Sequence, residues 1–278
     1  MVDQSRVGTG DPPADAAAAS FGGLRLAITF LTRVPVHPRR AAGPPDLVSA
    51  VPWFPVVGAL VGALVGGAYA GGSQLWPRPL AAAVAVTIGI VVTGAFHDDG
   101  LADMVDAFGG GFTRDDVLRI LKDSRHGTFG VSALVIVMAV RVGAIATFAP
   151  LDGVLAIVAA HALGRAGAVV LMRAAPLGAA DGLGASYAAG LHAGHVVAGA
   201  SAGLVVATAA LALWGLVAAA FVALACLLVA WLARRKVGGI TGDVLGAAAI
   251  LGELSTLLVA SAVIHRHAPS LGWWPHRS

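Results

Sequence analysis

The strongest constraint on this chain is a series of apolar runs, each long enough to cross a lipid bilayer as a helix of about 17–25 residues. The charged residues make up only 12% of the chain, about half the share in a typical soluble domain. The sequence therefore predicts an all-α, polytopic membrane bundle of about seven transmembrane helices. The expected spans are residues 48–70, 79–96, 130–149, 151–173, 195–213, 214–232 and 246–264.

The N-terminal part differs from the spans. Residues 1–19 are rich in Ala, Asp and Pro and are predicted to form a disordered leader, followed by a single membrane domain over residues 20–278. Ser20 is a suitable helix cap and Pro35 a stop. Between them we expect an amphipathic helix, either in the cytoplasmic membrane interface or packed on other protein. Its apolar face holds Phe21, Leu24, Ile28 and Leu31.

The basic residues predict the orientation. If the N-terminus is cytoplasmic and the spans alternate, thirteen of the 18 Lys and Arg residues lie on the cytoplasmic side and three on the other. The sequence thus indicates a protein of the bacterial cytoplasmic (inner) membrane. The polar loops 97–129, 174–194 and 233–245 then share the cytoplasmic side. These loop cations explain the net charge of +3, so no nucleic-acid partner is expected.

An acidic cluster opens the first of these loops. Asp99, Asp103 and Asp106 fall within about 60° of one another on a helix, and such a set of hard oxygen ligands suits Mg²⁺. A solvated acidic helix is the alternative. Asp98 points away from this face by about 100°. His97 is a candidate base, metal ligand or interfacial polar residue, and Asp106 is a second candidate for the general base.

Candidate phosphate ligands follow in the same loop. Lys122 and Arg125 lie three residues apart and are expected on one helical face, where they could grip a phosphate. Anchoring of the loop on the cytoplasmic side explains these cations almost as well. The residues between them, Asp123 and Ser124, are included among the expected substrate contacts.

A glycine-rich turn precedes the last span. Thr241 and Asp243 follow this turn and could bind an anion or a metal through backbone amides, a hydroxyl and a carboxylate. Alternatively, Asp243 only caps the last helix.

Two further features lie inside the spans. Gly58, Gly62 and Gly66 are spaced four apart, which lets helix backbones approach closely in lipid. Three charges at similar depth, Arg141, Arg165 and Glu253, are costly in lipid and should face the bundle interior. We expect either substrate contacts by the two arginines or a structural Arg–Glu pair.

The ordered set of polar motifs resembles the cobalamin synthase family, also called adenosylcobinamide-GDP ribazoletransferase. The resemblance implies an enzyme that joins adenosylcobinamide-GDP to α-ribazole or its 5′-phosphate. It needs Mg²⁺, releases GMP and forms adenosylcobalamin or its 5′-phosphate late in cobalamin biosynthesis. After Pro176 this chain departs from the family pattern. The matching segments are 30–36, 53–58, 97–103, Asp106, 122–130, 164–165, 182–184 and 239–247.

The expected partners are these two substrates and membrane lipid; a homo-oligomer and an association with other cobalamin-assembly enzymes both stay open. One rival function is a membrane alcohol phosphotransferase acting on a nucleotide-linked lipid, which also uses a helical aspartate cluster. A transporter is the other, since its intramembrane charges would line a pathway.

Overall fold

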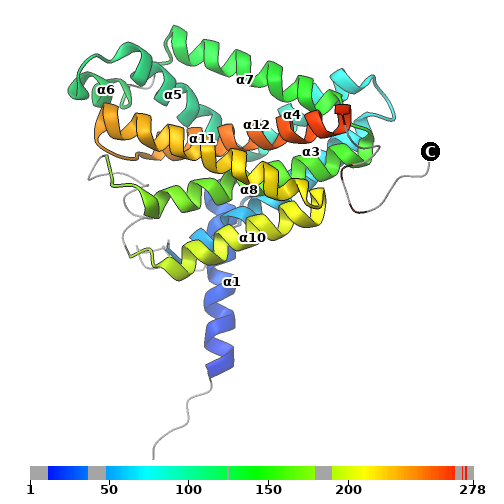
Figure 1. Ribbon diagram of the computed structural model, residues 1–278. Helices are drawn as coiled ribbons and strands as arrows, with labels where there is room; N and C mark the ends of the chain where they lie inside the picture. Colours follow the sequence, from blue (N-terminus) through cyan, green and yellow to red (C-terminus); the bar gives the residue numbers. More distant parts are fainter. Residues whose placement is uncertain are drawn as a thin grey trace, which may run out of the picture.

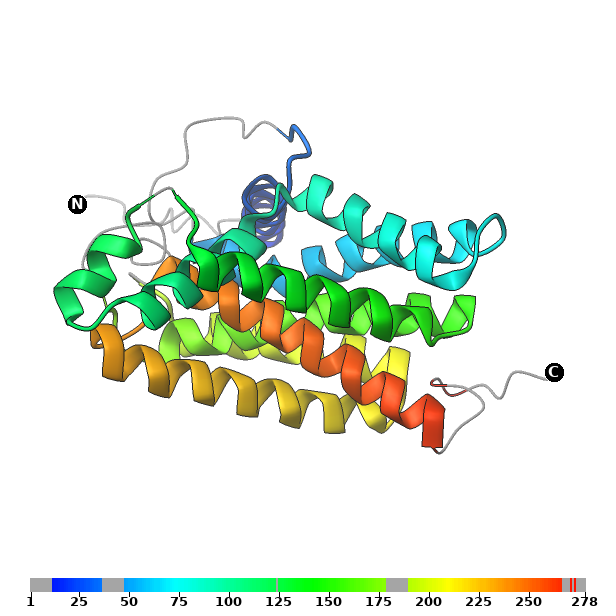
Figure 2. The ribbon, with the colours of Figure 1, turned by 90° about the horizontal axis from the view of Figure 1, so that it is seen from above.

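The computed structural model describes residues 12–36, 48–123, 125–178, 190–266, 271 and 273. Within them, six helical segments are long and apolar enough to cross a membrane, and they run side by side (Figures 1 and 2). This arrangement confirms the predicted all-α membrane bundle. The six are Val48–Gly72, which contains the short helix η1 (Val51–Trp53) and α3 (Phe54–Gly72), then α7 (Thr128–Ala146), α8 (Pro150–Ala174), α10 (Ala193–Leu211), α11 (Trp214–Val237) and α12 (Gly242–Arg266).

The second expected span is broken, which corrects the sequence prediction of one helix over residues 79–96. Helix α4 (Arg78–Thr93) ends, and α5 (Phe96–Gly110) leaves at 90° to it. The chain bends because Gly94 and Ala95 both have left-handed backbones, with φ of 64° and 59°. The two helices together make a seventh span if they are counted as one. A short helix, α6 (Arg114–Ile120), follows.

Helix α1 (Pro12–Leu31) lies across the bundle rather than along it (Figure 1). This is the direction expected of an interfacial helix when the bundle spans a membrane. It begins at Pro12 and not at Ser20, consistent with the preference of proline for the first helical turn. Its last turns bury Ala27 and Leu31 in the core of the protein. Residues 1–11 of the expected leader lie outside the described residues.

The polar segments expected to share one face meet at one end of the bundle. Lys236 Nζ donates a hydrogen bond to the Gly111 carbonyl at 3.2 Å, so the end of α11 touches the end of α5. Leu177, after α8, pairs in a short parallel bridge with Ile240, before α12. We call this end of the bundle, where the end of α5, the end of α11 and the start of α12 meet, the polar end. Residues 179–189 of the second loop lie outside the described part of the chain.

The glycine spacing in α3 has the packing role that was predicted. An added Cβ on Gly58, Gly62 or Gly66 would lie only 2.5–2.9 Å from backbone atoms of α8. Real side chains do not approach that closely, so the two backbones are in contact along this face. This close packing places α8 and its Arg165 firmly against α3.

Substitution of Gly62 tests this contact. In Gly62→Ala the new methyl group would lie 2.8 Å from the Cα of Val158, and we expect a loss of about 1–3 kcal/mol in the free energy of unfolding. Gly67→Ala is the matched control, because nothing lies within 4 Å of its Cβ position. Unfolding of the two variants in detergent measures the difference. Equal stability would contradict close α3–α8 packing.

Candidate active site

Helix α5 presents two chemically different faces because consecutive residues on a helix are turned by about 100°. Asp99 and Asp103 lie on the face toward the polar end and remain partly accessible, with side chains 62% and 18% exposed. His97 and Asp98 lie on the other face and are 6% and 7% exposed. The segment 97–129 is therefore not a simple polar loop, since its first residues are buried in the bundle.

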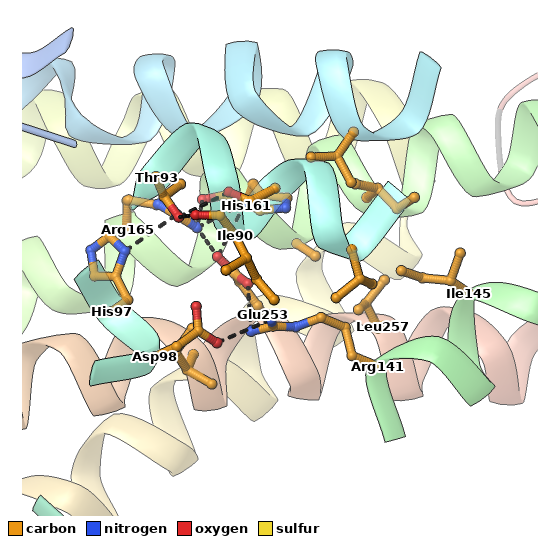
Figure 3. A pocket seen from close by; sticks show the side chains of 16 residues that line it. Ile90, Thr93, His97, Asp98, Arg141, Ile145, His161, Arg165, Glu253 and Leu257 are labelled. Atoms are coloured by element: carbon orange, nitrogen blue, oxygen red, sulfur yellow. Dashed lines mark hydrogen bonds and ion pairs between the residues drawn. The ribbon is translucent and has the colours of Figure 1, made fainter. Parts of the chain in front are cut away.

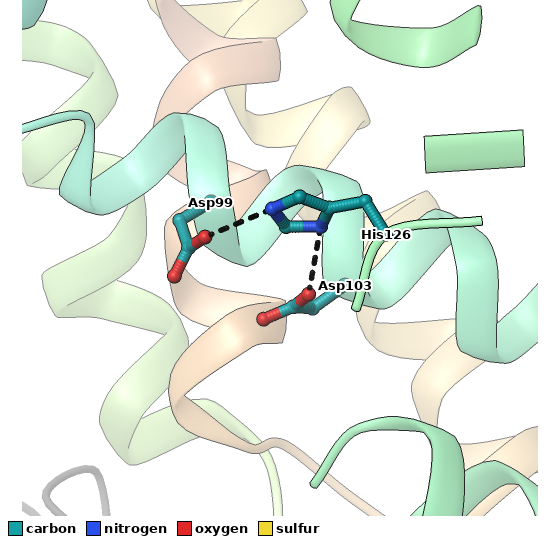
Figure 4. Close-up of side chains that lie close together, drawn as sticks. All are labelled: Asp99, Asp103 and His126. Carbon is teal, nitrogen blue, oxygen red and sulfur yellow. Dashed lines mark ion pairs between the residues drawn. The ribbon is translucent and has the colours of Figure 1, made fainter. Parts of the chain in front are cut away.

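Asp99, Asp103 and His126 form an acidic cluster at the polar end (Figure 4). His126 Nε2 lies 3.5 Å from Asp99 Oδ1, and His126 Nδ1 lies 3.4 Å from Asp103 Oδ1. One ligand atom from each residue lies within 4.8 Å of the others. His126 was not singled out from the sequence, because nothing local showed that the loop before α7 folds back over α5.

Asp106, the third expected metal ligand, has a different set of contacts. It is 8% exposed, and its two carboxylate oxygens accept hydrogen bonds from Gly127 N at 2.7 Å and Gly130 N at 2.9 Å. The free amides at the start of α7 need acceptors, and Asp106 supplies them. The observed cluster thus contains His126 in the place where Asp106 was expected, while Asp106 ties α5 to α7.

The turn before α12 brings Asp243 next to α5. A Cβ added to Gly100 would lie 3.1 Å from the Cα of Asp243, so the two backbones touch. The hydroxyl of Thr241 accepts from Val244 N at 3.4 Å and donates to Asp243 Oδ2 at 3.5 Å. The capping contact at this helix start is therefore made by Thr241, which leaves the Asp243 carboxylate beside the acidic cluster.

The prediction that Lys122 and Arg125 share one face of a helix is wrong, because α6 ends at Ile120. Arg125 instead holds Asp123 with two hydrogen bonds of 2.8 and 3.0 Å, and these keep the pKa of that carboxyl at about 2. Lys122 is exposed at the polar end. Ser124 lies outside the described residues.

Below the acidic cluster, a network of buried charges joins four helices (Figure 3). Arg141 of α7 contacts Asp98 of α5 at 3.1 Å and Glu253 of α12 at 3.4 Å. Arg165 of α8 also pairs with Glu253, and His161 Nδ1 lies 3.1 Å from the same carboxylate. The three intramembrane charges therefore face one another inside the bundle, as expected. Of the two alternatives left open by the sequence, they form the structural Arg–Glu pairing.

The network balances its own charge, with two guanidinium groups and two carboxylates. Charges at this depth are unfavourable in lipid unless they are paired. Arg165 Nη2 also lies 3.4 Å from His97 Nδ1, so His97 as well as Asp98 of α5 belongs to the network. Asp98 points away from Asp99 and Asp103, as the helical spacing predicted, but its partner Arg141 could not be identified from the sequence.

Glu253→Gln tests the network. Loss of this carboxylate charge would leave Arg141 paired with Asp98 and Arg165 without a carboxylate partner among the described residues, and we expect destabilisation by about 3–5 kcal/mol. Asp115→Asn is the control, because its carboxylate is exposed on α6 and an exposed charge should contribute little. Thermal unfolding in detergent compares the two variants. A Glu253→Gln protein as stable as the control would contradict the role of the network.

Comparison with known proteins agrees with the resemblance seen in the motifs. The family described as cobalamin-5-phosphate synthase matches residues 23–261. A protein of Bradyrhizobium diazoefficiens is 44% identical over 246 residues, which cover 86% of this chain and 93% of the relative. A protein of Leptothrix cholodnii is 37% identical over 248 residues, covering 84% and 92%.

A third relative, from Chlorobaculum tepidum, is 38% identical over 253 residues, or 87% of this chain and 95% of its own. All three relatives bear the name adenosylcobinamide-GDP ribazoletransferase. No solved structure matches the chain. Because the family match covers nearly the whole membrane bundle and both faces of α5, this chain belongs to the cobalamin-5-phosphate synthase family.

Proposed function

We propose that this protein is an adenosylcobinamide-GDP ribazoletransferase. It joins adenosylcobinamide-GDP to α-ribazole or its 5′-phosphate and releases GMP, in a late step of cobalamin biosynthesis. The observation that carries the proposal is the acidic cluster at the polar end, in a chain whose relatives bear this name. A hydroxyl of the nucleoside attacks the phosphate attached to the corrin side, and GMP leaves.

We further propose that the cluster holds Mg²⁺. Asp99 and Asp103 supply oxygen ligands in reach of one another, and Asp243 lies against the same helix; carboxylates are the ligands this ion prefers. Asp106 was also expected as a ligand, but both of its carboxylate oxygens accept hydrogen bonds from backbone amides. In this proposal Asp106 fixes α5 against α7 and does not bind the metal. Bound there, the cation would neutralise charge on the pyrophosphate of the substrate.

The general base is better assigned to His126 than to the candidates taken from the sequence. His97 is buried beside Arg165, and Asp106 accepts two amide bonds. The ring of His126 is 36% exposed and lies between Asp99 and Asp103. A base must reach the proton that it accepts, and this accessibility supports His126 as the group that accepts the proton of the attacking hydroxyl.

Phosphate contacts come from the exposed side chains at the polar end. Lys122 is exposed there and can provide a positive charge to the pyrophosphate. Arg125 is already paired with Asp123, so it can bind the pyrophosphate only if the phosphate replaces Asp123 as its partner. Arg141 and Arg165, expected as substrate ligands, have their terminal nitrogens in the buried network. In this proposal they do not contact the pyrophosphate.

The orientation and the membrane belong to the proposal as well. Among the described residues, Arg114, Lys122, Arg235 and Lys236 lie at the polar end, which favours the cytoplasmic side of a bacterial inner membrane. Cytoplasmic nucleotide substrates would reach the acidic cluster from that side. The six apolar helices support an integral membrane protein in general.

Release of GMP from adenosylcobinamide-GDP in isolated membranes tests the function. We expect release that depends on both α-ribazole and Mg²⁺, because the nucleoside is the acceptor and the pyrophosphate needs a counter-charge. CMP release from a CDP-linked lipid is measured in parallel. Release of CMP without release of GMP would instead identify the alcohol phosphotransferase alternative.

Asp103→Asn and Asp115→Asn serve as the matched pair in this assay. Asp103 belongs to the acidic cluster, whereas Asp115 is exposed on α6 outside it. We expect the first to lose at least about 100-fold in kcat/KM, the scale of a lost electrostatic contact in a transition state, and to need more Mg²⁺. The second should behave as wild type. Normal Mg²⁺ dependence in Asp103→Asn would exclude the cluster as the metal site.

Single cysteines in a Cys226→Ala background test the orientation. Arg114→Cys and Arg235→Cys lie at the polar end, and Leu75→Cys lies between α3 and α4 at the other end. In intact cells an impermeant thiol reagent should label only the cysteine at position 75, because the basic end remains inside. Labelling at position 114 or 235 from outside would reverse the assigned orientation.

A further inference from the structure

A narrow pocket lies on the other side of α5 and α12 from the acidic cluster. It is bounded by α1, α3, α5, α8 and α12 and has a volume of about 50 Å³. One water molecule needs about 10–15 Å³, so a group of several atoms fits. We call it the aromatic pocket; its main lining residues are Phe30, Phe54, Phe96, His97, Arg165 and Gly242.

Aromatic rings form its walls. Phe30 stacks on Phe54, with ring centroids 5.5 Å apart and planes 13° apart. Phe96 meets the edge of Phe30, with centroids 5.0 Å apart and planes at 74°. Such walls favour a flat aromatic ligand that can stack or meet ring edges. Phe96 is 40% exposed, so its ring can turn outward to admit a ligand larger than the present cavity.

The backbone before Phe96 supports a functional role for this position. Ala95 adopts a left-handed conformation with φ of 59°, which is unfavourable for a residue with a Cβ. Strained backbone of this kind occurs preferentially at functional sites. Here the bend directs the start of α5, with Phe96 and His97, to the pocket.

The pocket extends from Arg165, inside the bundle, toward the polar end. Along α8 it extends from Arg165 to Met172, about 10 Å at the rise of a helix. It also reaches Gly242, whose neighbour Asp243 packs against Gly100 of α5. A ligand with its ring beside Arg165 would therefore extend toward Asp243, at the start of α12 and at the polar end.

We propose that the aromatic pocket binds the base of the acceptor nucleoside, the benzimidazole of α-ribazole. This inference rests on the proposed function. The rings of Phe30 and Phe96 contact the flat base, and the ribose extends along α8 toward Gly242 and its neighbour Asp243.

The polarity of the pocket favours this base over the guanine of the second substrate. Guanine has several donors and acceptors on its edges, and each would need a partner when buried. Apart from Arg165 and His97, the lining side chains are apolar. A benzimidazole nucleoside offers one ring acceptor and no ring donor, so it leaves fewer polar ring atoms without a partner in this lining.

Phe96→Leu and Phe221→Leu test the assignment. Both phenylalanines are exposed, by 40% and 51%, but Phe221 lies on α11 away from the pocket. For Phe96→Leu we expect the KM for α-ribazole to rise about tenfold, the scale of one lost base–aromatic stacking contact. Its KM for adenosylcobinamide-GDP and all constants of Phe221→Leu should stay within about twofold. Phe96→Tyr keeps the ring and should restore the wild-type KM.

A binding measurement separates this inference from the proposed function. α-Ribazole should raise the Tm of the purified wild-type protein in detergent, and Phe96→Leu should lose most of that shift. An unchanged KM for α-ribazole, a rise confined to adenosylcobinamide-GDP, or a shift retained in Phe96→Leu would overturn the pocket assignment. Wild-type protein that shows the Phe96-dependent shift but releases no GMP would refute the proposed function and leave the pocket assignment standing.

Discussion

The buried ion-pair network is the interaction on which the rest of the site depends. Asp98 is adjacent in sequence to Asp99, so the contact that fixes Asp98 against Arg141 also fixes the rotation of α5. Glu253 ties the same network to α12, the helix that carries Asp243 at its start. The acidic cluster thus has a rigid support inside the bundle, where an unpaired charge would be costly and the ion pairs are correspondingly hard to open.

Small residues make this network geometrically possible. A Cβ added to Gly164 would lie 3.0 Å from Cγ of Glu253, and one added to Gly252 would lie 3.0 Å from Cα of Gly164. Helices α8 and α12 therefore touch through glycine at the level of the charges. The guanidinium of Arg165 can then reach a carboxylate on the neighbouring helix, as small residues at membrane helix contacts allow in general.

Much of the bundle follows from the sequence, because apolar run length and glycine spacing are local signals of membrane helices. The break at Gly94 and Ala95 was not predicted, since an Ala in a left-handed conformation leaves no sequence signature. The burial of Arg141, Arg165 and Glu253 was predicted from their cost in lipid, but Asp98 and His161 as partners depend on long-range contacts. The same reason explains why His126 was missed and why the amide contacts of Asp106, which was expected among the metal ligands, were not foreseen.

The two faces of α5 meet two different chemical requirements. A phosphate reaction needs water-accessible carboxylates and cations, and these lie at the polar end with Asp99, Asp103 and Lys122. A flat, weakly polar base is more stable away from water, between aromatic rings. Because α5 begins beside Arg165 and extends to the polar end, one helix can align both parts of a nucleoside. The bend between α4 and α5 is therefore the feature that joins the membrane interior to the acidic cluster.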